Sequence, residues 1–324
     1  VAEPLNVYSS LFASDEIRRD YFLFMWKTLM QCHPHDSICG CSVDDVHSEM
    51  VTRFKKVLAA GKSVAADELE KTVAKIDTSS VGSDKVITVF NPHGFVSGEK
   101  VSVSVDFPKD AEISAEMLSV YDGDKVIPAD VEDLGVVFDY ILPKDKFRIP
   151  FHTRRFILTF RASCVPALGY KSYAVKTESA KSASDLVLYK RAMANKRLRV
   201  KFESDGSLVV TDRKTGKEFI TGIMKDTGDI GDEYIYRQSK DLLTVSTEGV
   251  RAKTELISST SAAITFRVTH TMKIPADVDR STGNRTGEAS LVIENYYTLR
   301  EGADRLDVKT VIHNNAKNHR VVML

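Results

Sequence analysis

The chain has 324 residues, of which 43% are hydrophobic and 28% are charged. This composition supplies enough apolar material for packed cores, and the length favours two or three domains, so a disordered, collagen-like or repeat-solenoid protein is excluded. Lys and Arg together number 45, as do Asp and Glu, which gives a formal net charge of +0. Because there is no basic excess, nucleic acid and anionic membrane surfaces are not expected as partners.

No apolar run approaches the roughly 18–20 residues that a membrane-spanning helix needs. The densest run, residues 21–30, is interrupted by Lys27. Three of the four cysteines lie close together and the fourth is distant: Cys32, Cys39, Cys41 and Cys164. This spacing is not a disulfide framework for a chain of this size, so we expect reduced thiols and a cytoplasmic protein.

Both ends of the sequence favour a fragment. The first residue is Val1 rather than Met, and the apolar pattern continues to Leu324 without a polar tail. We therefore expect a chain that is truncated at both ends, and the N-terminal residues then say nothing about targeting.

The first predicted helix covers residues 14–32. Ser14 can cap its start, and the residue before Pro34 marks its end, because a residue that precedes proline avoids the helical region. Apolar side chains recur at helical spacing along it, at Ile17, Tyr21, Phe22, Met25, Trp26, Leu29 and Met30. A surface this broad predicts a helix that packs against at least two neighbours.

Two further helices are predicted before the first domain boundary. One starts at Ser42, where the sequence resembles a capping box, and the other runs from about Ser63 to Ile76. The polar stretch 78–83 then ends the helical region. Residues 1–80 are thus predicted to form a three-helix bundle segment.

From Lys85 onward the apolar period changes from 3.6 to 2, which indicates β-strands. Hairpin turns are predicted at Asp122-Gly123 and Asp205-Gly206, and a surface loop at 275–288. Short strands without intervening helices favour antiparallel sandwiches. We predict an α+β protein: a small β-sandwich at 84–177 and a larger, truncated one at 178–324 follow the helical segment.

The segment richest in potential metal-binding side chains joins the first two predicted helices, at residues 31–42. His33, His35 and Asp36 flank a stiff proline turn, and imidazole nitrogens and carboxylate oxygens are zinc ligands. One short turn does not supply the three or four ligands of a zinc site, so the spacing alone favours a helix stop in which these side chains satisfy backbone groups. The Cys39-x-Cys41 pair lacks a second pair downstream, which favours small buried thiols over a metal site.

The same segment resembles the bacterial branch of the glycoside hydrolase family 38 α-mannosidases. The central motif is His33-Pro34-His35-Asp36-Ser37-Ile38-Cys39-Gly40-Cys41-Ser42, flanked by 26–30 and 46–50. Shorter matches follow in order at 89–92, 165–170, 206–217, 231–234 and 318–320. The resemblance covers nearly the whole chain.

The resemblance implies a retaining, zinc-dependent α-mannosidase with an N-terminal α/β domain, a helix bundle and β-sandwich domains. By this resemblance His35 is a zinc ligand, Asp36 contacts the mannose and supports the metal site, and Tyr234 reaches the sugar subsite. The aglycone and the linkage are not implied.

The resemblance also implies that the catalytic nucleophile and the other zinc ligands lie in an N-terminal domain, which does not precede Val1 in this sequence. We therefore expect no catalytic residue within residues 1–324, and no hydrolase activity from them without that partner domain. Asn318 stands where relatives commonly have Asp.

A non-catalytic carbohydrate-binding or assembly module is the alternative function. Tyr121, Tyr140, Tyr296 and Tyr297 could stack on sugars, although strands favour tyrosine in any case. Exposed sheet edges could also pair two copies of the chain as a homo-oligomer.

Overall fold

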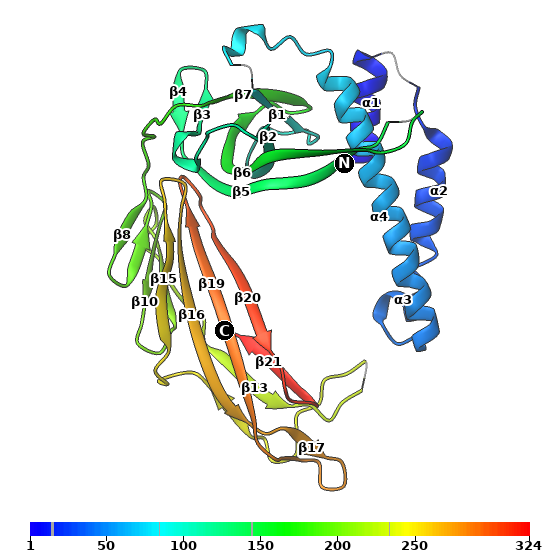
Figure 1. The fold of residues 1–324 in the computed structure, drawn as a ribbon. Coiled ribbons are helices and arrows are strands. Elements are labelled where there is room, and N and C mark those ends of the chain that lie inside the picture. Colours follow the sequence, from blue (N-terminus) through cyan, green and yellow to red (C-terminus); the bar gives the residue numbers. More distant parts are fainter. Residues whose placement is uncertain (14–15, 84, 144, 233) are drawn as a thin grey trace. The chain divides into compact units, whose positions relative to one another are not determined.

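A computed structural model of the chain describes residues 1–13, 16–83, 85–143, 145–232 and 234–324. Helices come first and antiparallel strands follow, so the predicted α+β class is confirmed (Figure 1). Contacts divide the chain into two compact units. The first, here the helical unit, is Val1–Glu99 with Ala162–Val175, and the second, here the β unit, is Lys100–Arg161 with Lys176–Leu324. The predicted domain boundaries stay a prediction.

Four α-helices occupy the helical unit: α1 (Ala2–Phe12), α2 (Arg19–Met30), α3 (His35–Cys39) and α4 (Asp44–Val73). The prediction missed α1 because its buried face includes the polar Asn6 and Ser9, which hide the apolar period. The two helices predicted after residue 42 are one helix, α4. A single internal Gly61 costs only about 1 kcal/mol relative to alanine, and this does not end a helix that packs on its neighbours.

The helices pack around a small apolar cluster and a buried polar network. Phe22 and Met25 of α2 meet Val64 of α4, and α2 and α4 run side by side (Figure 1). The Arg18 guanidinium binds the fully buried Glu68 carboxylate at 2.9 Å, and the Asn6 side chain accepts the Arg18 N–H at 2.9 Å. These bonds tie the α1–α2 connection to α4.

Much of the apolar surface predicted to be buried on the first helix is exposed. Only Phe22 and Met25 of α2 are buried. The exposed apolar residues of this stretch are Ile17, Tyr21, Leu23, Phe24, Trp26 and Met30. The predicted cap Ser14 lies outside the described residues.

Two strands complete the helical unit. β1 (Lys85–Asn91) pairs antiparallel with β7 (Gly169–Lys176), from Lys85 opposite Val175 to Asn91 opposite Gly169. The buried Asn91 amide donates to the Phe95 and Pro166 carbonyls at 2.7 and 3.0 Å. Asn91 thereby fixes the turn that precedes β7.

A three-stranded sheet has the order β2 (Ser97–Pro108), β6 (Ile149–Val165), β5 (Ala129–Ile141). β3 (Ser119–Asp122) and β4 (Lys125–Ile127) form the hairpin predicted at Asp122-Gly123, which is confirmed. Two 3₁₀ turns, η1 (Ser79–Val81) and η2 (Ala115–Met117), interrupt the loops.

The rest of the β unit is a sandwich. One main sheet has the strand order β12 (Glu218–Thr221), β11 (Leu208–Asp212), β10 (Leu198–Phe202), β9 (Ala192–Ala194), β8 (Val187–Tyr189). The other has the order β15 (Lys253–Ser259), β16 (Ala263–Ile274), β19 (Ala289–Arg300), β20 (Leu306–His313). Phe202 and Leu208 of the first sheet pack on Phe266 and Tyr297 of the second. The hairpin predicted at Asp205-Gly206 joins β10 to β11 and is confirmed.

Two smaller sheets close the end of the sandwich. One has the order β14 (Thr244–Ser246), β13 (Met224–Gly228), β21 (His319–Met323). The other pairs β17 (Asp277–Asp279) with β18 (Asn284–Thr286), so the loop predicted at 275–288 is in fact a short hairpin. Its one large apolar residue, Val278, is buried and anchors it. In the part of the chain that the structure describes, no helix is long and apolar enough to cross a membrane.

Candidate functional site

The His-Pro-His-Asp motif forms a tight turn between α2 and α4. Pro34 precedes the single-turn helix α3, and the Ile38 N–H donates to the Pro34 carbonyl at 3.0 Å. Gly40, at φ +84°, ends the turn in the left-handed region that glycine favours. The Cys41 N–H then returns to the Asp36 carbonyl at 3.1 Å, which closes the loop around His35 and Asp36.

His35 and Asp36 form a solvent-exposed pair. The Nε2 atom of His35 lies 3.2 Å from Oδ1 of Asp36, with 91% and 62% of the two side chains exposed. The Cys41 thiol lies 3.7 Å from the same carboxylate oxygen. With Nε2 held by a carboxylate, Nδ1 carries the lone pair that a metal or a proton could take.

The helix-stop interpretation of these side chains is not supported. Neither His33 nor His35 bonds a backbone group among the described residues, and α2 ends through backbone contacts such as the His33 N–H to the Met30 carbonyl at 3.0 Å. The motif therefore presents its polar groups to the surroundings rather than to its own backbone.

The donor types of this turn fit zinc, but their number does not complete a site. Zinc takes four ligands in structural sites and three protein ligands in catalytic ones. Over the described ranges, no group of three or more His, Cys, Asp or Glu side chains could hold a metal ion. Cys32 is buried, with its thiol 3.7 Å from the Thr28 carbonyl. Cys39 is exposed and Cys41 is half-buried, so the prediction of buried thiols is wrong for this pair, which lies in the exposed turn. The described residues thus offer at most part of a zinc site.

Apolar residues on either side of the pair in the sequence are exposed. Val43 is 70% exposed, and Met30, Ile38 and Val46 are exposed as well. Exposed apolar side chains in the same short stretch of chain as polar groups are compatible with an interaction site.

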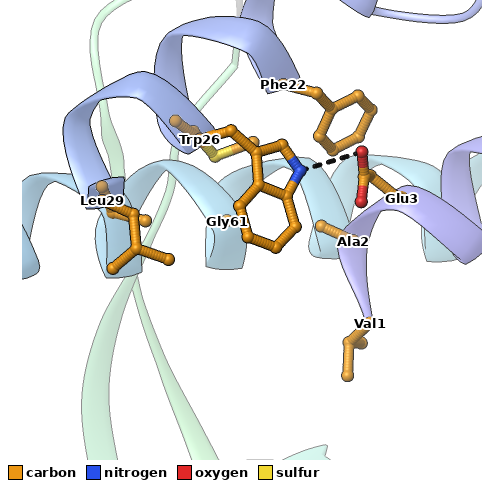
Figure 2. A pocket seen from close by; sticks show the side chains of 9 residues that line it. Val1, Ala2, Glu3, Phe22, Trp26, Leu29 and Gly61 are labelled. Carbon is orange, nitrogen blue, oxygen red and sulfur yellow. Dashed lines mark hydrogen bonds between the residues drawn. The ribbon is translucent and has the colours of Figure 1, made fainter. Parts of the chain in front are cut away.

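A small pocket lies on the same helices (Figure 2). It has a volume of about 170 Å³ and is lined by α1, α2 and α4, including Glu3, Phe22, Leu29 and Gly61. The indole Nε1 of Trp26, from the motif that flanks the His-Asp turn, donates to Oε1 of Glu3 at 3.1 Å. This bond joins α2 to α1 and holds the indole ring across the pocket.

Tyr234 lies in the β unit, in the loop between β13 and β14, and is 70% exposed. Its N–H and that of Ile235 donate to Oδ1 of Asp232, at 3.0 and 2.9 Å. These backbone donors, first Ile235 and then Tyr234, lower the pKa of Asp232. Glu233 lies outside the described residues. The structure places His35 and Asp36 together in the helical unit and Tyr234 in the other unit.

A buried ionic cluster that was not predicted from the sequence lies at the base of the Tyr234 loop. The Asp226 carboxylate is fully buried, pairs with the Arg285 guanidinium and lies 2.5 Å from Nδ1 of His319. The other ring nitrogen of His319 lies 3.0 Å from the Asn314 side chain. The short match at 318–320 was the one available signal, since it includes His319.

Asn318 also has a structural explanation. At φ +48° it adopts the left-handed conformation that asparagine tolerates. Its amide donates to Oδ1 of Asp277 at 2.7 Å. An aspartate at this position would face a second carboxylate, so the departure from relatives at Asn318 matches its local partner.

The candidate sugar-stacking tyrosines divide into two groups. Tyr297 is fully buried in the sandwich core, and Tyr121 is buried with its hydroxyl 2.5 Å from Glu178. Neither offers a ring face to a sugar. Tyr140 and Tyr296 are more accessible, but a cation already lies over each ring, that of Arg148 and that of Lys309. Packing in strands therefore explains these aromatics.

Comparisons with known proteins agree with the resemblance in the sequence. Residues 109–177 match the family model described as glycosyl hydrolases family 38 C-terminal domain 1. A protein of Halalkalibacterium halodurans, provisionally named a mannosylglycerate hydrolase, is 30% identical over 358 residues, covering 99% of this chain and 40% of the relative.

Two crystal structures from Enterococcus faecalis are similar to the chain. One, of an alpha-mannosidase from strain V583, has a TM-score of 0.89 and 29% identity over 99% of this chain and 40% of that chain. The other, of a protein in glycosyl hydrolase family 38, has a TM-score of 0.86 and 26% identity over 99% and 42%. The chain spans about 40% of the length of the relatives it matches.

Proposed function

We propose, on the premise that this chain corresponds to the C-terminal part of a family 38 glycoside hydrolase, that it is part of a retaining, zinc-dependent α-mannosidase acting on terminal α-mannosides. The premise rests on the family-model match and on similarity along 99% of the chain to relatives more than twice its length. The relative provisionally named a mannosylglycerate hydrolase makes mannosylglycerate one substrate to test.

The exposed His35–Asp36 pair, with exposed apolar residues on either side of it in the sequence, is the observation that carries the proposal. The pair supplies two potential metal ligands beside exposed apolar residues, as expected for one half of a site that another part of the protein completes. His35 supplies one nitrogen ligand, and the remaining ligands come from parts of the protein outside these residues. When bound, the zinc ion orients sugar hydroxyls and withdraws charge from them.

The residues of this chain bind and orient the sugar. Asp36 accepts hydrogen bonds from mannose hydroxyls, and a charged acceptor makes such bonds stronger than a neutral one does. Asp36 also holds the His35 ring in place, at 3.2 Å, and so fixes which nitrogen faces the metal. Tyr234 contacts the sugar from its exposed loop.

In a retaining glycosidase a carboxylate attacks the anomeric carbon, and water then releases the sugar from the glycosyl-enzyme. That nucleophile lies outside residues 1–324 in this proposal, and these residues alone do not hydrolyse mannosides. The four cysteines are free thiols, which supports a cytoplasmic location. A homo-oligomer stays a prediction, which sedimentation velocity would test.

The test compares this chain with a longer protein that contains it, using an aryl α-mannoside and mannosylglycerate. We expect turnover and bound zinc only in the longer protein. His35→Ala should lower its activity at least about 100-fold and its zinc content, since misplacing a reacting group by about 1 Å costs that much. His47→Ala, which changes a partly exposed histidine of α4, is the matched control. Full activity of the His35 variant, or turnover by the isolated chain, would contradict the proposal.

A further inference from the structure

A second cavity in the helical unit lies away from the His-Asp turn. It has a volume of about 320 Å³ and is enclosed by α1, the end of α4, β1 and the turn before β7. Its lining includes the rings of Tyr8, Phe12, Phe90 and Tyr170, together with Ile76 and Lys75. This volume is at the lower end of small-molecule sites, which occupy about 300–1,000 Å³.

Two aromatic pairs form the walls of this cavity. Tyr8 and Phe12 lie one turn apart on α1, with stacked rings whose centroids are 6.1 Å apart. Phe90 and Tyr170 are direct partners across the β1–β7 ladder, with centroids 5.7 Å apart. Each pair is fixed by its own secondary structure, so the walls are formed before a ligand arrives.

The turn that closes the cavity is also held in place. The Leu168 N–H donates to the His93 carbonyl at 2.8 Å, and the Asn91 amide binds the Pro166 carbonyl. A Cβ atom at Gly169 would lie 3.2 Å from the Pro166 side chain. The turn therefore packs tightly enough to hold its shape.

Two hydrogen-bond donors line the cavity without partners. The Tyr8 hydroxyl is buried and bonds no other described group, and its burial raises the pKa of the phenol, which stays protonated and can donate. An unpaired buried hydroxyl is costly, so a ligand acceptor there is favourable. Lys75 has no ion-pair partner among the residues that the structure describes.

The lining has no compensating negative charge. None of the lining residues is acidic, and the Thr72 hydroxyl already donates to the Glu68 carbonyl at 2.7 Å. The lining thus combines one lysine and one unpaired hydroxyl with four aromatic rings, which matches a ligand with one anionic end and one flat apolar end. A sugar would leave most of its hydroxyls unpaired against these rings.

We propose that this cavity binds a ring-bearing carboxylate, with the ring between the two aromatic pairs and the carboxylate on Lys75 Nζ and Tyr8 Oη. The assignment is independent of the proposed hydrolase function, because it uses none of the residues of the His-Asp turn. Binding of this kind is also distinct from stacking on a sugar, since it requires the negative charge.

Isothermal titration calorimetry of the 324-residue chain tests the proposal with two probes of the same shape, 2-naphthoate and the neutral 2-naphthylmethanol. We expect saturable 1:1 binding of naphthoate, at least about tenfold tighter than that of the alcohol, since hydrogen bonds to a charged group are worth that much. Lys75→Met and Tyr8→Phe should each remove most of this preference. Lys75→Arg should keep it.

Lys62→Met is the matched control, because Lys62 is an exposed lysine of α4, the helix that precedes Lys75, and lies outside the cavity. Circular dichroism should show that every variant is folded. The proposal would be overturned if naphthoate did not saturate the chain or if the two probes bound equally well. It would also be overturned if Lys75→Met bound naphthoate as tightly as the unchanged chain. Binding to this chain but not to a longer protein that contains it would also overturn it, because the cavity would then be an internal contact surface.

Discussion

Neutralising Asp226 should destabilise the β unit more than any other single loss of charge we can identify. Asp226 is fully buried on β13, and its partner Arg285 exposes only 1% of its side chain. Asp226→Asn preserves the size of the side chain but leaves the buried Arg285 guanidinium without its ion-pair partner. Beyond that pair, the change also removes the charge beside His319 at 2.5 Å.

The expected magnitude follows from what remains around Arg285. Its other acceptors are the Asp226 and Leu243 carbonyls, at 3.5 and 3.4 Å, which are weak contacts. Removing one partner of a buried pair costs roughly 3–5 kcal/mol of unfolding free energy. Arg285→Met together with Asp226→Asn should recover a large part of this loss, because no unpaired charge is then buried.

Urea unfolding followed by far-ultraviolet circular dichroism measures this loss in the strand-rich unit. The sole tryptophan, Trp26, reports the helical unit, and its fluorescence transition should stay unchanged. Glu288→Gln is the control, since it breaks the exposed Lys273–Glu288 contact of 3.5 Å and should change nothing measurable. A loss below about 1 kcal/mol for Asp226→Asn would refute the reasoning, because surface pairs already reach that value.

Three further predictions concern the β unit. Gly206→Ala should cost about 2–5 kcal/mol of unfolding free energy, since the residue has φ +81° and its Cβ would lie 2.5 Å from a neighbouring methyl group, whereas Gly216→Ala, at φ +71° in open space, should lose only the backbone part. Backbone N–H donors lower the pKa of Asp232 in the folded state below its ordinary value of 3.8. The ionised carboxylate therefore stabilises the folded turn above pH 3.8, and this stabilisation is lost as the pH falls through the pKa of the folded state. The protection factors of the amides in its turn, corrected for the intrinsic exchange rate, should therefore fall in acid, and Asp232→Asn should abolish that pH dependence. Phe202→Ala should cost about 3–5 kcal/mol in the core, whereas the same change at the exposed Phe219 should cost little, and equal losses in urea unfolding would show that burial is not the cause.

Local patterns in the sequence predict much of the fold. Alternating apolar residues place the long strands β16 and β19, and Asp205-Gly206 marks its hairpin. The prediction is wrong where tertiary packing overrides the local signal. Helix α1 buries Asn6 and Ser9, and α4 passes through Gly61 without a break.

The candidate site is predictable only in part. The His35–Asp36 pair is adjacent in sequence, so a motif reveals it. Asp226 meets Arg285 and His319 across 59 and 93 residues, a pairing that no local pattern contains. The cavity beside Lys75 is equally hidden, because its aromatic residues come from elements far apart along the chain.

Because α4 is long, a small change in its tilt produces a large displacement of its far end. Its 30 residues span about 45 Å, from beside the His-Asp turn to the aromatic cavity. A tilt of about 5° around the cavity end of such a rod swings the opposite end by about 4 Å. The position of the His-Asp turn therefore depends on how rigidly the Arg18–Glu68 ion pair holds the opposite end of the helix.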